Sequence, residues 1–203
     1  MTANAYCTAA EVKAVMPDSF ATTDTDYDTL LGTLASRASR AIDRFCKRDM
    51  GAFYADTDET KYFDGSGTDE LLIDELAAAP TSLSVAEDGI NYTDWTTEDY
   101  ILWPYNRTPY TRILVDMMNG AKSIFPKFPR AVKIVGKFGY SVAVPDDIKQ
   151  AAIIMTVRYF KRGQQGFNDV GAVVELGQLR YVDKLDPDVA AILLDGGYVR
   201  MMI

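Results

Sequence analysis

The segment YFDGSGTDELLI, residues 62–73, contains residue types that occur in phosphate-binding and metal-binding loops. Two glycines bracket a serine, and acidic residues lie on both sides, so a phosphate or a metal ion could be considered. A phosphate-binding loop usually adds a lysine, whereas no basic residue occurs between 62 and 73, and the acidic side chains would repel a phosphate. The apolar residues on both sides instead predict a hairpin turn, in preference to a calcium site.

The sequence contains no histidine, which removes histidine-based catalytic triads and nearly all zinc sites. Its two cysteines, Cys7 and Cys46, lack metal-site spacing and predict free thiols in a reducing compartment. We therefore expect no catalytic residue, no cofactor and no metal ion. A hydrolase built on carboxylates stays open, but it requires two carboxyl groups that converge in a cleft.

The net charge of −8 is unevenly distributed along the chain. Residues 51–100 contain 13 acidic residues and one basic residue, whereas residues 101–150 contain 3 acidic and 8 basic residues. Such asymmetry predicts complementary surfaces, either within one molecule or between copies. A broad basic face for duplex DNA is not expected at this overall charge.

The charged residues must be positioned by secondary structure. Helices are predicted on both sides of the central, strongly charged segment. Apolar residues recur every three or four positions in 26–47 and in 146–162, and acidic residues lie at the start of both segments. Because the burial of one helix face must offset the backbone entropy, we expect these two helices to pack together. Shorter helices are expected from Thr8 to about Met16 and over 186–196, and Gly163 is expected to end the long helix before a loop over 163–178.

Between these helices the apolar pattern changes to a period of two, which is typical of strands. The clearest case is 131–138, where apolar residues alternate with Lys133 and Lys137. Strands are expected at 59–64, 70–74, 81–87, 99–103, 112–116 and 131–138.

The expected fold is therefore α+β: an antiparallel helical bundle from the N- and C-terminal helices, with an inserted small antiparallel β domain. The expected boundaries are 1–50 for the first half of the bundle, 51–144 for the inserted β domain, and 145–203 for the second half with a C-terminal tail.

No apolar run approaches the roughly 20 residues that span a bilayer, and no secretory signal is visible, so no membrane is expected.

The aromatic residues of the β segment suggest a surface on which a sugar could stack, although aromatic residues are also common in sheet cores. The residues concerned are Tyr92, Trp95, Tyr100, Trp103, Tyr105 and Tyr110. We expect most of them to lie in the core or in a contact with a partner.

In order along the chain, several segments resemble the head–tail connector proteins, also called adaptors, of tailed bacteriophages, prophages and gene transfer particles. The segments are YCTAAEVKAVMP, LLGTLASRASRAIDRFCKRD, ETKYFDGSGTDELLID, TSLSVAEDG, VKIVGKFGYSVAVPDDIKQAAIIMTVRYFKRG and LDPDVAAILLDGGYVR. The junction over 138–151 is the most specific of them. Many relatives have a shorter loop in place of the long β segment.

This resemblance implies a structural protein of the virion neck without catalytic activity, assembled in the cytoplasm of a bacterial host. It implies a ring, usually of twelve copies, that docks beneath the portal protein and binds a head-closure or tail protein below. It also implies that the ring extends the DNA channel, through which DNA passes without specific binding.

Two sets of residues are candidates for these contacts. For docking to the portal we select the end of the chain: Tyr198, Arg200, Met201, Met202 and Ile203. A closed ring needs different faces of one copy to meet, so we pair basic with acidic residues for the interface between copies. The basic residues are Arg37, Arg40, Arg44, Lys133 and Lys137, and the acidic ones are Asp69, Glu70, Asp74 and Glu75. The alternative is a soluble carbohydrate- or protein-binding β module without catalysis.

Overall fold

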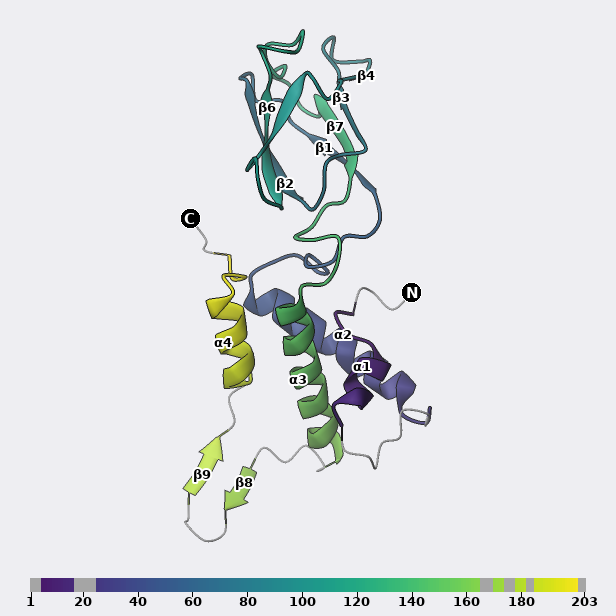
Figure 1. Cartoon of the computed structure of the whole chain (residues 1–203), viewed down its shortest axis with the longest axis vertical. Helices are drawn as coiled ribbons and strands as arrows, with labels where there is room; N and C mark the ends of the chain where they lie inside the picture. The colour runs from purple at the N-terminus through teal and green to yellow at the C-terminus, as the bar shows by residue number, and fades with distance from the viewer. Residues whose placement is uncertain (1–4, 17–24, 165–169, 174–177, 182–184, 201–203) are drawn as a thin grey trace. The chain divides into compact units, whose positions relative to one another are not determined.

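The structure is a computed structural model that describes residues 5–16, 25–164, 170–173, 178–181 and 185–200. It divides into two compact units, one formed by Met1–Gly51 with Val144–Ile203 and the other by Ala52–Ala143. We call them the helical unit and the β unit. Helices occur in the first and antiparallel sheets dominate the second, so the predicted α+β class is confirmed (Figure 1).

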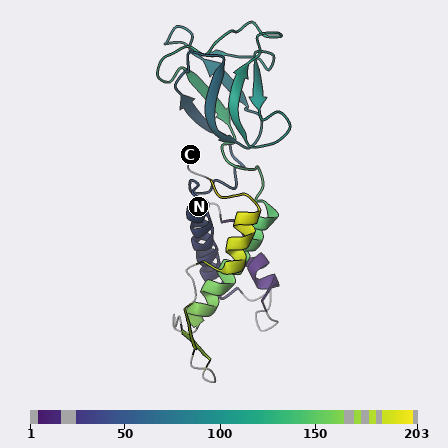
Figure 2. The ribbon, with the colours of Figure 1, turned by 90° about the vertical axis from the view of Figure 1, so that its left-hand side faces the viewer.

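The described part of the helical unit contains four helices: α1 (Ala9–Ala14), α2 (Asp28–Phe45), α3 (Asp146–Gln164) and α4 (Pro187–Asp195). α2 packs on α3, α1 contacts both of them, and α4 lies beside α3 in both views (Figures 1 and 2). Thr8 caps α1 through the predicted capping box with Glu11, and Asp186 caps α4 ahead of Pro187.

The periodic apolar stripes of α2 and α3 form the core of this unit, as their spacing predicts. Alanine residues are among the buried side chains of both helices. The buried residues are Leu31, Ala35, Ala38, Ser39, Ile42 and Asp43 of α2, and Ile148, Ala151, Ala152, Ile153, Met155, Thr156 and Phe160 of α3.

The region predicted as a loop over 163–178 is partly regular structure, so that prediction is wrong. α3 includes Gly163 and ends at Gln164, and β8 (Val170–Val173) pairs antiparallel with β9 (Gln178–Tyr181). Gly171 lies within β8 opposite Arg180, where it takes part in strand pairing. The prediction treated the glycines as evidence for a loop, but a glycine weakens a helix or strand without excluding it.

The β unit contains two antiparallel sheets. One has the order β1-β7-β3-β4 and the other β2-β6-β5. Their bounds are β1 (Glu59–Phe63), β2 (Glu70–Leu76), β3 (Ser82–Val85), β4 (Thr93–Asp94), β5 (Tyr100–Trp103), β6 (Tyr110–Val115) and β7 (Val132–Gly136). All the predicted strands are present within a few residues of their expected bounds. The short β4 was not predicted.

The two sheets enclose one hydrophobic core, with β2 and β6 on one side and β1, β3 and β7 on the other (Figure 1). Alternate residues of β2, β3, β5, β6 and β7 point into it, which explains the period of two in the sequence. Its buried members are Leu71, Leu83, Val85, Trp95, Ile113, Val115, Phe125, Ala131, Val132 and Ile134.

The glycine-rich segment does not form the predicted hairpin. β1 pairs with β7 and β2 pairs with β6, so the segment connects one sheet to the other. The N–H groups of Gly65 and Gly67 donate to the carbonyl oxygens of Phe128 and Phe125, both at 3.0 Å. A Cβ at Gly65 would lie 1.6 Å from the carbonyl oxygen of Pro126, so glycine is required for this close approach between loops.

Candidate functional site

The residues selected for portal docking begin in a segment that is fastened to the helical unit. Tyr198 is buried, its hydroxyl donates to Asp147 Oδ2 at 3.1 Å, and its carbonyl oxygen accepts from Arg48 Nε at 3.0 Å. The Arg200 N–H donates to the carbonyl oxygen of Cys46 at 3.0 Å, and the Arg200 side chain is exposed. Met201, Met202 and Ile203 lie outside the described residues. Tyr198 thus anchors the segment, whereas Arg200 is accessible to a partner.

The three arginines of α2 have different environments. Arg37 is exposed, and its guanidinium lies 4.9 Å from the centre of the Tyr159 ring. Arg44 is exposed as well. Arg40 is half-buried, and its Nη2 lies 3.3 Å from Asp43 Oδ2. Arg37 and Arg44 are therefore available to a neighbouring molecule, whereas Arg40 belongs to a network inside its own unit.

That network is centred on Asp43, which was not among the residues predicted from the sequence. The Asp43 carboxylate is 2% exposed, and it accepts hydrogen bonds from the Tyr6 hydroxyl and from the Gly51 N–H, the latter at 3.0 Å. Burial raises the pKa of Asp43, although these hydrogen bonds and Arg40 oppose the change. An acidic residue on the buried stripe of a helix was the signal in the sequence. Its role here is structural.

The charged residues selected on the β unit are placed on two different sheets. Lys133 lies on β7 and Lys137 directly follows it, both half-buried. The acidic residues lie at or next to β2, where Glu70 pairs with Arg112 at 2.7 Å and Asp74 pairs with Lys61 at 2.8 Å. Asp69 is exposed and Glu75 is half-buried. The structure thus supplies partners within the same chain for Glu70 and Asp74.

The aromatic residues do not form one stacking surface. Trp95 is buried and stacks on Phe125 with ring centres 5.0 Å apart. Trp103 and Tyr105 form a separate, exposed edge-to-face pair at 4.6 Å. A shallow hollow of about 340 Å³ beside Trp103 includes Glu75 and Arg107 in its lining. Tyr92 forms a third contact, with the Tyr62 ring at 6.0 Å, so the exposed aromatic residues occur as separate pairs.

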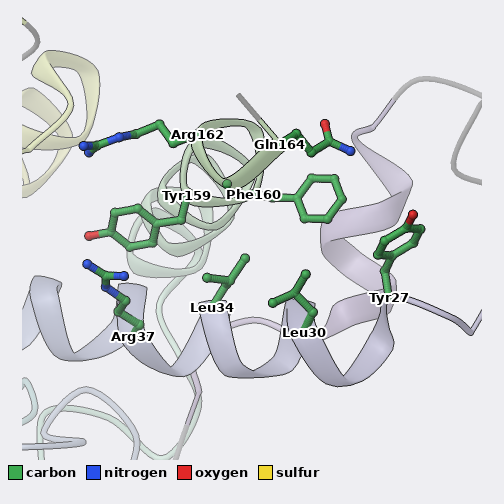
Figure 3. Close-up of a pocket in the computed structure, with 9 residues that line it drawn as sticks. Tyr27, Leu30, Leu34, Arg37, Tyr159, Phe160, Arg162 and Gln164 are labelled. Carbon is green, nitrogen blue, oxygen red and sulfur yellow. The ribbon is translucent and has the colours of Figure 1, made fainter. Parts of the chain in front are cut away.

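An apolar groove lies between α2 and α3 in the helical unit (Figure 3). It has a volume of about 360 Å³, and Leu30 and Leu34 of α2 point toward Phe160 of α3 across it. Arg37 and Arg162 are the charged residues that line it, and none of the described lining residues is acidic. The groove is suited to an apolar side chain carried on an acidic surface.

The described residues include no group of three or more cysteine, aspartate or glutamate side chains placed to hold a metal ion. Among the described helices, none combines the length and the apolar character needed to cross a membrane.

Comparisons with known proteins give matches in structure. No family model matches the sequence, and no curated protein matches it. A chain of the neck of the native GTA particle, computed with C12 symmetry, aligns with a TM-score of 0.53 at 14% identity, over 87% of this chain and 85% of that chain. This chain has the fold of a gene transfer agent neck chain.

Two further structures agree. A chain from the neck of the empty GTA particle, computed with C6 symmetry, aligns at a TM-score of 0.52 and 16% identity, over 87% of this chain and 80% of that chain. A chain from the virion of the native gene transfer agent aligns with a TM-score of 0.54 at 15% identity, over 96% of this chain and 89% of that chain. The resemblance to head–tail connectors is thus confirmed as a likeness of fold. All three structures are of particles or their necks, not of enzymes.

Proposed function

We propose that this protein is a structural component of the neck of a virion or gene transfer particle. The single observation that carries the proposal is the fold shared with chains of two gene transfer agent necks over 87% of this chain. The gene transfer agent necks were computed with C6 and C12 symmetry, which favours a ring of identical copies here as well.

In this proposal about twelve copies form a ring that docks under the portal protein, extends the DNA channel and receives a head-closure or tail protein. The helical unit acts as the bundle of the connector, with the β unit inserted into it. Arg200, with the residues after it, contacts the portal. The excess of negative charge leaves few groups to hold DNA phosphates, so DNA passes without specific binding.

Negative-stain electron microscopy of the purified protein, alone and mixed with portal rings from the same particle, tests this function. Added density at one end of the portal, with the rotational symmetry of the portal, is the expected result. A protein that stays monomeric and never binds the portal would overturn the proposal.

The exposed Trp103–Tyr105 pair supports a second candidate, a carbohydrate-binding β module. Glycan-array binding that is lost on Trp103→Ala would favour this candidate over the neck protein. The absence of any glycan binding would remove it.

A further inference from the structure

Two turns at one end of the β unit share the pattern Asp-X-apolar-Asn. They are residues 88–91, which follow β3, and residues 116–119, which follow β6. In the first, Asp88 Oδ1 accepts from the N–H groups of Ile90 and Asn91 at 2.9 and 2.7 Å, and the Asn91 amide donates to Asp88 Oδ2 at 2.8 Å.

The second turn repeats this arrangement. Asp116 Oδ1 accepts from the N–H groups of Met118 and Asn119 at 3.0 and 3.1 Å, and the Asn119 amide donates to Asp116 Oδ2 at 2.8 Å. Each turn is therefore held by side-chain hydrogen bonds at both of its ends, which reduces the freedom of its tip.

Each turn presents a large apolar residue to the outside. Met118 is 93% exposed and Ile90 is 80% exposed. The two loops are joined, because Lys122 of the second forms an ion pair with Glu87 of the first. Both leave the end of the β unit at which β7 begins (Figure 1). Large apolar side chains on preorganised turns are typical of a surface that contacts another protein.

The charge around these tips limits the kind of partner. Hydrogen bonds from Asn91 and Ile90 lower the pKa of Asp88 to about 2, and those from Asn119 and Met118 lower the pKa of Asp116. Both carboxylates stay ionised at neutral pH. Lys122, the one basic residue of loops 86–92 and 116–124, is already paired with Glu87. Anionic lipid headgroups and nucleic acid phosphates would be repelled.

The groove between α2 and α3 has the complementary chemistry. Leu30, Leu34 and Phe160 provide an apolar lining, Arg37 provides positive charge at its edge, and its volume of about 360 Å³ accommodates a methionine or isoleucine side chain (Figure 3).

We propose that the Met118 turn of one copy, accompanied by the Ile90 turn, docks into the α2–α3 groove of a second copy. The proposal rests on the proposed function in one respect, namely that copies of this chain assemble. Because the contact joins two different faces, each copy can bind one neighbour through its turns and another through its groove, as a closed ring requires.

Disulfide trapping between two single-cysteine variants tests this contact. Met118→Cys and Leu30→Cys chains are mixed in equal amounts and oxidised, with and without portal rings. The native thiols, Cys7 and Cys46, are buried and compete little. The matched control replaces Met118→Cys by Leu72→Cys, because Leu72 lies on β2 of the same unit and is 67% exposed.

The expected result is a mixed disulfide that forms at least about tenfold faster than in the control mixture, in one or both conditions, because docking raises the local concentration of the paired thiols. A rate equal to that of the control in both conditions would overturn the contact. If rings on the portal are nevertheless seen by electron microscopy, the proposed function survives and only this interface is wrong. If neither rings nor portal binding is seen, both proposals fail.

Discussion

The Tyr6 hydroxyl donates a hydrogen bond to the Asp43 carboxylate, across a separation of 37 residues in the chain. This bond ties the segment before α1 to the buried face of α2. The Tyr6 N–H also donates to Ser39 Oγ at 2.9 Å, so both ends of the tyrosine are fixed to the same helix. An ionisable group at the centre of this contact makes the helical unit sensitive to substitution and to pH.

Asp43→Ala is expected to lower the free energy of unfolding by roughly 3 kcal/mol, because it leaves Tyr6, Gly51 and Arg40 without their shared acceptor. Urea denaturation at neutral pH measures the change. Asp56→Ala is the control, since Asp56 is an exposed acid of the β unit. Equal effects of the two substitutions would contradict the structural role of Asp43.

The stability contributed by Asp43 should fall as pH rises. Burial raises the pKa of Asp43 in the folded state, so the folded protein holds a proton that the unfolded chain releases above its ordinary carboxyl pKa of 3.8. That stabilisation is complete below the unfolded pKa and is lost as pH rises through the folded pKa. Relative to Asp43→Asn, the wild type should therefore lose stability between about pH 4 and about pH 7, as measured by urea unfolding at both values. A constant difference would argue against the raised pKa.

Gly65→Ala is expected to destabilise the β unit by roughly 1–3 kcal/mol, because its Cβ would overlap the carbonyl oxygen of Pro126 and force the loops apart. Gly32→Ala is the matched control, since a Cβ at this position of α2 meets nothing within 4 Å. There alanine should stabilise the helix by up to about 1 kcal/mol. Thermal unfolding of the two variants should thus shift in opposite directions.

The two tryptophans should differ sharply in their effect on stability. Trp95→Ala removes a buried side chain that stacks on Phe125, and it should cost roughly 3–5 kcal/mol. Trp103→Ala removes a ring that is 39% exposed and lies outside the hydrophobic core of the β unit, so it should change the free energy of unfolding by less than about 1 kcal/mol. Chemical denaturation of both variants makes the comparison, and similar losses would mean that Trp103 also belongs to a core.

Removal of residues 201–203 is expected to abolish binding to portal rings while leaving the melting temperature unchanged. The truncation stops short of Tyr198, whose hydrogen bonds to Asp147 and Arg48 hold the preceding segment. Co-sedimentation with portal rings measures the binding. Full binding by the truncated chain would remove these residues from the proposed portal contact, and Arg200→Glu would then test the remaining candidate.

Charge reversal at Lys133 and Lys137 is expected to weaken ring assembly and to flatten its dependence on salt, if these residues pair with acidic residues of a neighbour. Lys161→Glu with Lys47→Glu is the control, because it changes the net charge equally at exposed positions of the helical unit. Light scattering over a range of salt concentrations follows assembly. Identical curves for the two double variants would exclude this pairing.

Local patterns in the sequence predicted the four described helices and six of the strands, but not β4, β8 or β9. The stripe along α2 and the alternation around Lys133 reflect which residues face a core, and that depends on helix and strand geometry alone. The same holds for the capping box of Thr8 and Glu11, because it involves neighbouring residues. The absence of histidine likewise narrows the possible chemistry whatever the fold, because it is a property of composition alone.

Strand pairing, burial of polar groups and the grouping of exposed residues were decided by the tertiary structure. The segment at 62–73 was predicted as a hairpin because its strands are adjacent in sequence, but β1 and β2 each pair with a distant strand that offers the right register and apolar face. Asp43 is buried because Tyr6 and Gly51 converge on it. The tips at Ile90 and Met118 lie at one end of the β unit because β3 and β6 both end there. Long-range contacts of this kind depend on the packing of whole sheets and helices, which no short stretch of sequence contains.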